Sequence, residues 1–280
     1  MRGEAPSQHD FDHVYTRQLY AGFGHKQFGE LTYGNMVTIT DEVTQSDLAN
    51  TYSLTDGLLE TSARRVAQYV YNGDYGSNKV KFGAYYGGSS KRDIKNVDLK
   101  NNRKNTWGTG LIFDHEIDSI QNVTVAAGFT REISENADKT AYYSNAYALG
   151  LAYNFVHTTY GLDFAHKDTK NKDGAGNKVK NNEVTAVIRQ GLNEDWNVYA
   201  MYSYKTEKTL PVGSAYSKST DRQFLVGTEY YVYNQGSLKV KPFIEWQATR
   251  TKYENTFDDA GKQLDRSRDF KTVIGLRAYW

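Results

Sequence analysis

The chain lacks cysteine entirely and contains only 3 prolines among its 280 residues. Without cysteine it can form no disulfide and offers no thiol nucleophile or thiolate metal ligand. It also lacks any run of about 18 apolar residues, which excludes a transmembrane helix. Its net charge is only +1, so the charge balance does not suggest binding to nucleic acid. These absences leave a chain that neither crosses a membrane as helices nor depends on cysteine chemistry.

Motifs of catalysis are missing as well. His25, His115, His157 and His166 show no HxxxH or HExxH spacing among themselves, so these four are not expected to form a metal site. The sequence contains no GxSxG elbow and no P-loop. Asp114 and His115 are adjacent, so on a strand they face opposite sides and cannot cooperate. We therefore predict that the chain is not an enzyme and binds no cofactor.

Apolar and polar residues alternate along much of the chain. In residues 79–89, for example, Val80, Phe82, Ala84 and Tyr86 share one face. This period of two is typical of a strand with unlike faces, and along the chain it predicts about thirteen strands. The predicted strands are residues 14–24, 28–35, 64–72, 79–89, 104–115, 122–131, 143–155, 158–164, 184–192, 196–204, 224–232, 238–246 and 270–280.

The connections alternate strictly between short turns and long polar loops, the latter at residues 90–103, 168–181 and 254–267. Outer-membrane barrels have short periplasmic turns and longer extracellular loops, whereas a soluble β-sandwich shows no such alternation. We therefore predict an all-β fold, a transmembrane antiparallel β-barrel with its long loops outside the cell. Residues 1–280 are expected to form a single barrel domain.

The two faces of the predicted strands differ in polarity. One face carries large apolar side chains such as Leu149 and Leu151, and the other carries charges with many Gly, Ser, Thr and Asn. So many aromatics could not fill one interior, and barrels of about sixteen strands leave an aqueous channel. We therefore predict that the apolar face meets lipid, with Tyr and Trp girdles near the strand ends, and that the charged face lines water. The predicted pore-lining residues are Lys81, Lys104, Arg189, Glu229, Lys241, Glu245, Lys271 and Arg277.

Residues 36–62 form the only long segment that interrupts the rhythm of strands. This segment carries five carboxylates, those of Asp41, Glu42, Asp47, Asp56 and Glu60, and no Lys or Arg. A connection this long is uncommon in a compact domain and is usually functional. It either folds into the bore and narrows it or stays on the surface as an acidic loop. The basic side chains predicted on the inner wall favour the inward fold.

The direction of the strands predicts that the barrel begins before residue 1. If the long loops are extracellular, the first and last predicted strands both run towards the periplasm. Single-chain barrels have an even strand number, and an open sheet edge cannot lie in lipid. One, three or five further strands would give totals of about fourteen, sixteen or eighteen. The first ten residues also have no apolar core, so we expect the signal peptide and the first strands to be absent from this sequence.

Two stretches resemble the Gram-negative trimeric general porins, especially those of Haemophilus and Pasteurella. TRQLYAGFGHKQFGELTYGN, residues 16–35, is similar to the paired fourth and fifth strands that precede the constriction loop of that family. GLRAYW, residues 275–280, resembles the porin terminal strand, whose final aromatic residue is part of the recognition signal for the barrel assembly machinery. The resemblance implies about sixteen strands, an inward-folded third loop, a homotrimer, and a missing segment that holds strands one to three.

The resemblance also implies a charged eyelet, in which wall arginines face carboxylates of the third loop. Arg17 and Arg64 stand where two wall arginines are expected. The PEFGGD motif of the enterobacterial porins is missing, and Asp47 is nearest to the expected carboxylate position. We expect Asp47 to project into the bore opposite Arg17 and Arg64. The candidate constriction residues are Asp47, Asp41, Glu42, Arg17, Arg64 and Arg65.

We interpret the chain as an outer-membrane porin for passive diffusion of small hydrophilic solutes and ions. The loop would set the size limit, and opposed charges on loop and wall would create a field across the bore. The expected partners are a second and third copy of the chain, outer-membrane lipid and lipopolysaccharide, the diffusing solutes and ions, and the barrel assembly machinery through Trp280. Nucleic acid is not among them.

Two alternatives remain open. A substrate-selective porin would need an aromatic track along the bore, and Tyr85, Tyr199 and Tyr231 share the inward parity but are scattered. A surface-exposed structural or adhesin barrel would have a plugged bore. Single-channel conductance separates the three, because a pore gives large ohmic steps, a plug gives none, and a selective channel is blocked by one solute.

Overall fold

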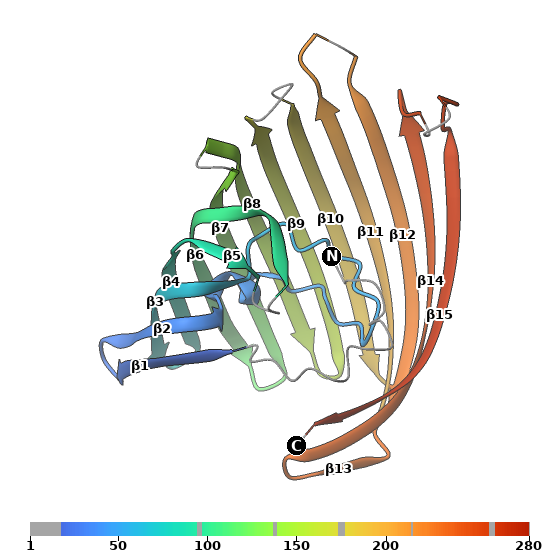
Figure 1. Cartoon of the computed structure of the whole chain (residues 1–280). Coiled ribbons are helices and arrows are strands. Elements are labelled where there is room, and N and C mark those ends of the chain that lie inside the picture. The colour runs from blue at the N-terminus through green and yellow to red at the C-terminus, as the bar shows by residue number, and fades with distance from the viewer. Residues whose placement is uncertain are drawn as a thin grey trace.

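The computed structural model describes residues 18–93, 97–136, 139–172, 177–213, 215–257 and 261–279. These residues form one strongly curved antiparallel sheet (Figure 1). Its order is β1-β2-β3-β4-β6-β7-β8-β9-β10-β11-β12-β14, with β15 beyond β14, and the short β5 and β13 pair with β6 and β14. The strands are β1 (Leu19–His25), β2 (Gly29–Val37), β3 (Ser62–Tyr75), β4 (Asn78–Gly87), β5 (Ser90–Arg92), β6 (Asp98–Asp118), β7 (Gln121–Asn136), β8 (Lys139–Phe155), β9 (Thr158–Asn171), β10 (Lys178–Gly191), β11 (Trp196–Leu210), β12 (Ser217–Tyr230), β13 (Tyr233–Gln235), β14 (Leu238–Glu254) and β15 (Arg266–Tyr279).

The predicted all-β antiparallel architecture is confirmed. Thirteen of the described strands have seven residues or more, which agrees with the count from the period of two. At the long-loop end of the sheet the strands are longer than predicted: β6 begins at Asp98, β9 ends at Asn171 and β10 begins at Lys178. These extensions are polar on both faces, so they carry no alternation to detect, yet they stay paired with their neighbours. Among the described residues, no helix is long and apolar enough to cross a membrane.

The polarity of the two faces is the reverse of that in a water-soluble sheet. On the outer face, Leu149 and Leu151 are 56% and 46% exposed. On the inner face, Asp163 and Glu245 are 7% and 0% exposed. Carboxylates are almost never fully buried unless they are paired, so the inner face must supply them with partners. The outer face is apolar and open, as expected for a surface that meets lipid.

The partners come from the segment between β2 and β3, which we call the inner loop (residues 38–61). It lies on the concave side of the sheet, where Figure 1 shows it as a light-blue trace in front of the middle strands. It begins with a short 3-10 helix, η2 (Ile39–Val43), and otherwise has no regular structure. The prediction that this segment folds to the inside of the wall agrees with its position.

Candidate functional site

The inner loop crosses most of the concave face and then returns. Ile39 packs over β4 and β6, and Val43 packs over β7 and β8. Asn50, Thr51 and Tyr52 reach β14, where they donate to Glu245. On the way back Asp56 contacts β10 and β11, and the chain rejoins the sheet at β3. The loop therefore follows the inner wall from one strand to the next.

A row of glycines makes room for the first limb of the loop. Gly83, Gly110 and Gly128 lie directly opposite one another in β4, β6 and β7. A Cβ atom at Gly128 would lie 2.8 Å from Val43 Cγ2, and one at Gly150 in β8 would lie 2.2 Å from Val43 O. Real Cβ atoms do not approach so closely, because interiors are packed to van der Waals contact. Only glycine lets this limb lie flat against the wall.

Apolar side chains of the loop fill the space between loop and wall. Ile39, Val43 and Leu59 are buried together with wall residues such as Tyr85 and Ile112. Further along the loop, a second cluster joins Leu54 to the wall residues Val187, Tyr199, Met201 and Leu225. Burying such side chains contributes roughly 1.5–3 kcal/mol each. The loop thus has a small hydrophobic core of its own inside the polar face of the sheet.

Beyond the glycine row, wall carboxylates accept the backbone N–H groups of the loop. Asp163 of β9 accepts the Gln45 N–H at 2.9 Å, the Ser46 N–H at 2.7 Å and the Ser46 hydroxyl at 2.5 Å. Glu183 of β10 accepts the Asp56 N–H at 2.9 Å. An irregular segment has no internal partners for these amides, and a buried amide without a partner is costly. The carboxylates therefore replace the missing secondary structure.

The largest of these anchors holds the far end of the loop at β14. Glu245, which is fully buried, accepts the N–H groups of Asn50, of Thr51 at 3.0 Å and of Tyr52 at 2.9 Å. The Tyr199 hydroxyl of β11 donates to the same carboxylate at 2.7 Å. Charge-assisted hydrogen bonds of this kind are roughly twice as strong as neutral ones.

Glu229 of β12 is the centre of a charged network beside this anchor. Lys241 donates to it at 2.5 Å, Arg189 donates to its other oxygen, and the Asn50 side-chain amide donates at 2.8 Å. Glu229 and Lys241 are buried, Arg189 is partly exposed, and the loop amide completes the network. A buried carboxylate requires such pairing.

Wall lysines bind three of the five carboxylates of the loop. Lys81 of β4 pairs with Glu42 at 2.5 Å, Lys167 of β9 pairs with Glu60 at 3.1 Å, and Lys205 of β11 pairs with Asp56. The side chains of Glu42 and Asp56 are each 48% exposed, so these two pairs border the open bore. Asp41 and Asp47 are also exposed on the loop.

The predicted constriction residues separate into two places. Asp41, Glu42 and Asp47 lie on the exposed side of the inner loop. Arg64 and Arg65 lie instead at the start of β3, where the Arg64 carbonyl accepts a 2.5 Å hydrogen bond from Arg103. Arg17 and Trp280 lie outside the described residues. Basic partners of the loop include Lys81 of β4, Lys167 of β9 and Lys205 of β11.

The predicted pore-lining residues lie along β4, β6, β10, β12, β14 and β15. Arg189, Glu229, Lys241 and Glu245 belong to the charged network and the anchor at the far end of the loop. The others make local contacts, as follows: Lys81 with Glu42, Lys104 with Glu135 at 2.6 Å, Lys271 with Asp269 at 3.0 Å, and Arg277 opposite Lys241 in the register of β14 and β15.

An anchoring role for Asp163, Glu183, Lys167 and Lys205 is not visible in the sequence. By the period of two, each lies on the charged face of its strand, which is where the structure has it. The period of two shows on which face of a strand a residue lies, but not which residue it contacts. Which loop amide each carboxylate binds depends on the path of the irregular loop. The one available signal was the number of carboxylates on an inner face next to a long connection.

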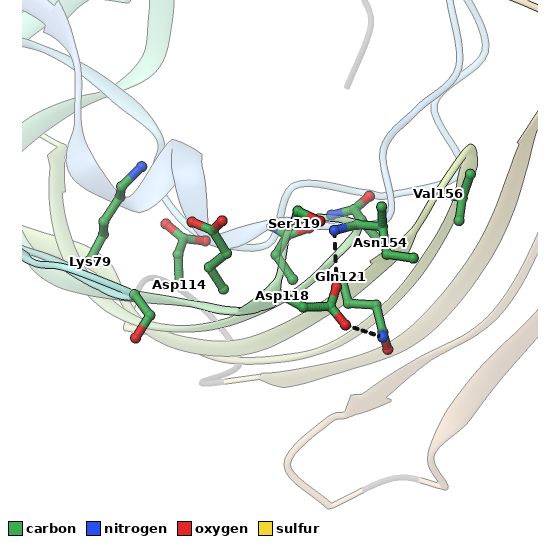
Figure 2. Close-up of a pocket in the computed structure, with 11 residues that line it drawn as sticks. Lys79, Asp114, Asp118, Ser119, Gln121, Asn154 and Val156 are labelled. Atoms are coloured by element: carbon green, nitrogen blue, oxygen red, sulfur yellow. Dashed lines mark hydrogen bonds between the residues drawn. The ribbon is translucent and has the colours of Figure 1, made fainter.

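A separate pocket lies at the short-turn end of the wall. It measures about 340 Å³ and is lined by Lys79, Asp114, Glu116 and Asp118 among others. Figure 2 shows Asp118 accepting the Gln121 side-chain amide, a bond of 2.7 Å, with Lys79 on the far side of the pocket. Its residues belong to β4, β6, β7, β8 and the turns that join them, so it is distinct from the inner loop.

A curved sheet with an apolar outer face, and a polar inner face that holds a folded loop, defines the class of outer-membrane β-barrel channels. The family model of the Gram-negative porins matches residues 3–240, and the chain belongs to that family. It is an outer-membrane porin.

Known relatives agree with this assignment. A major outer membrane protein of Pasteurella multocida is 24% identical over 95% of this chain and 68% of its own length. Another, from strain Pm70, is 22% identical over 99% of this chain and 75% of its own length. Among solved structures, OmpT of Vibrio cholerae matches with a TM-score of 0.61 at 15% identity, over 91% of this chain and 77% of that one. An anion-selective porin from Comamonas acidovorans also has a TM-score of 0.61, at 14% identity over 90% and 75%.

Proposed function

We propose that the protein is a passive diffusion channel for small hydrophilic solutes and ions, narrowed by the inner loop and acting without catalysis. The observation that supports this most is the fixed position of the loop, which lies flat against the inner wall through Asp163, Glu183 and Glu245. A loop anchored in this way narrows the bore without crossing it. Its exposed carboxylates then bias the narrowed region towards cations.

The two alternatives fit the contacts less well. Tyr85 and Tyr199 are each only 4% exposed, and their hydroxyls donate to the Glu60 carbonyl and to Glu245. They anchor the loop, so they are not available as a track for a solute. Tyr231 faces the ammonium of Lys241, 5.3 Å from its ring centre. A plugged bore would require a loop that spans the lumen, whereas this loop stays on the wall.

We further propose that the channel acts as a homotrimer in outer-membrane lipid. The structure of Vibrio cholerae OmpT includes a trimer form, and that protein shares the fold of this chain. Lipid would meet the exposed apolar face that carries Leu149 and Leu151. Chemical cross-linking of the protein in native outer membranes, followed by gel electrophoresis, tests the trimer.

Planar-bilayer recording on the complete protein tests the channel. We expect large ohmic steps that no single sugar or amino acid blocks. Absence of steps from correctly folded protein would mean a plugged barrel, and block by one solute would mean a selective porin.

The Asp47→Asn variant tests the role of the exposed carboxylates. We expect the reversal potential in a salt gradient to shift towards anions, while trimer stability stays the same. The shift should shrink at high salt, because the Debye length falls from about 10 Å at 0.1 M to about 3 Å at 1 M. An unchanged reversal potential at low salt would remove Asp47 from the narrowed region. Glu254→Gln, at the end of β14, is the matched control.

A further inference from the structure

A strongly basic pocket lies at the end of the wall opposite the short turns. We call it the rim pocket; it measures about 510 Å³. Its charged lining residues are Arg64, Arg65, Lys91, Arg92, Arg103 and Glu135, five cations and one carboxylate. The carboxylate already binds Lys104, which is not part of the lining, at 2.6 Å. Arg92 pairs with Asp98, which is not part of the lining, at 2.9 Å. The lining still carries more positive than negative charge, mainly from Arg65, Lys91 and Arg103, and the proposed diffusion pathway does not use it.

Two β-bulges shape the rim pocket. In β3, Arg64 and Arg65 together stand against the single residue Asn35 of β2, so β3 has one extra residue between Val66 and Ala63, and Arg65 has a φ of 54°. In β6, Lys104 is unpaired between Arg103 and Asn105. Bulges re-aim side chains, and a non-glycine residue in the left-handed region is strained. Both irregularities bring arginines to one hollow.

Arg103 is the fixed part of the rim pocket. It is 6% exposed, and its guanidinium donates to the Gly88 carbonyl at 2.9 and 3.1 Å and to the Arg64 carbonyl at 2.5 Å. Neutral carbonyls orient the group without cancelling its charge. These contacts use Nε and Nη2, so Nη1 is the part of the guanidinium that can donate to an oxyanion in the pocket.

The height of the rim pocket matches the boundary of the membrane. Arg65 lies ten residues along β3 from Tyr75 at the short turn, and a strand crosses the hydrocarbon in about 9–11 residues. Asn35, which also lines the pocket, shares its strand face with the exposed outer residues Leu31 and Tyr33. The pocket therefore borders the outer surface where the apolar band gives way to polar headgroups.

We propose that the rim pocket binds a phosphate group. Clustered arginines suit phosphate, because its several oxygens can accept charge-assisted hydrogen bonds from more than one guanidinium at once. A phosphorylated glycolipid headgroup in the outer leaflet and a soluble phosphate at the channel mouth present the same chemistry, so two probes are needed to distinguish them.

The test compares the folded parent with the double variant Arg65→Gln/Lys91→Gln, which leaves Arg103 in place. The matched control is Lys79→Gln, which removes one cation from the acidic pocket at the other end of the same wall (Figure 2). One arm measures binding of bis-phosphorylated lipid A and of its dephosphorylated form in phosphatidylcholine nanodiscs by native mass spectrometry. The other arm titrates inorganic phosphate into the protein in neutral detergent by calorimetry.

We expect the parent and the control to prefer the phosphorylated lipid, and the double variant to bind it about tenfold or more weakly. Lys91→Gln alone changes an exposed residue and should weaken the binding less. It is the variant to compare with the parent if the double variant misfolds. If the double variant loses binding only of inorganic phosphate, the ligand is a soluble phosphate. If phosphorylated lipid and inorganic phosphate bind the double variant and the parent equally, or bind neither, the proposal is overturned.

Discussion

The wall supports the first limb of the inner loop and the far part of the loop in different ways. Under the first limb, β4, β6, β7 and β8 provide glycines and apolar contacts for Ile39 and Val43. Under the far end, β9, β10 and β14 provide carboxylates for backbone amides. The first limb presents apolar side chains to the wall, so the wall residues beneath it only have to be small enough to leave space for them. The far end presents unpaired N–H groups, so the wall must accept hydrogen bonds.

This difference means that the two supports should fail differently. Filling the glycine row forces the loop away from the wall, because no apolar side chain fits beneath it. Removing a carboxylate leaves the loop in place but weakens its attachment. Steric support therefore controls the position of the loop, and polar support controls how firmly it is held.

The largest effect is expected for Gly150→Leu. Its Cβ would lie 2.2 Å from the Val43 carbonyl oxygen and 2.8 Å from an Asp163 carboxylate oxygen, and overpacking of this kind costs about 1–3 kcal/mol or more. We expect the loop to move into the bore and single-channel conductance to fall. Leu151→Ala, one residue away on the outer face, is the control and should conduct normally. Normal conductance of folded Gly150→Leu would mean that the loop does not rest on this row.

A smaller effect is expected for Glu245→Gln. The amide still offers one acceptor oxygen, but the charge-assisted hydrogen bonds from Asn50, Thr51 and Tyr52 are weakened. Hydrogen bonds to charged groups contribute about 1.5–3 kcal/mol, so the end of the loop should open more often. Hydrogen exchange should accelerate at residues 50–52 and not at residues 39–43. Exchange rates equal to those of the parent at both segments would argue against anchoring by this carboxylate.

The smallest effect on stability is expected for Lys81→Gln. Its pair with Glu42 is exposed, with side chains 34% and 48% accessible, and such pairs contribute about 0–1 kcal/mol. Thermal stability should therefore change little. The reversal potential should shift towards cations, because the Glu42 charge is no longer compensated. A large loss of stability would mean that this pair, and not the glycine row, holds the first limb.

Much of the fold could be predicted from alternation, because a period of two assigns each strand residue to a face. The same reasoning does not apply where a bulge adds a residue. Arg64 and Arg65 are predicted at the narrow part of the channel, and the structure, in which β3 has one extra residue at this point, has both in the lining of the rim pocket. Lys104 lies at another bulge, so alternation does not determine its face. No local signal in the sequence announces either bulge.

For the residues that contact the inner loop, the sequence allowed a prediction of charge but not of identity. An acidic loop was expected to meet a basic wall, and Lys81, Lys167 and Lys205 fulfil that role. The anchoring by Asp163 and Glu245 was not expected, because like charges on loop and wall suggest repulsion. The structure resolves this by joining wall carboxylates to loop amides and by pairing Glu42, Asp56 and Glu60 of the loop with wall lysines.

The central claim is that the inner loop borders the open channel, and one engineered cysteine tests it. The chain has no cysteine of its own, so Asp47→Cys provides a single thiol. Adding a charged methanethiosulfonate reagent during planar-bilayer recording should lower the conductance in discrete steps, and Leu151→Cys on the outer face should give no steps. If mass spectrometry shows complete modification of Asp47→Cys while the conductance stays the same, the loop does not border the channel.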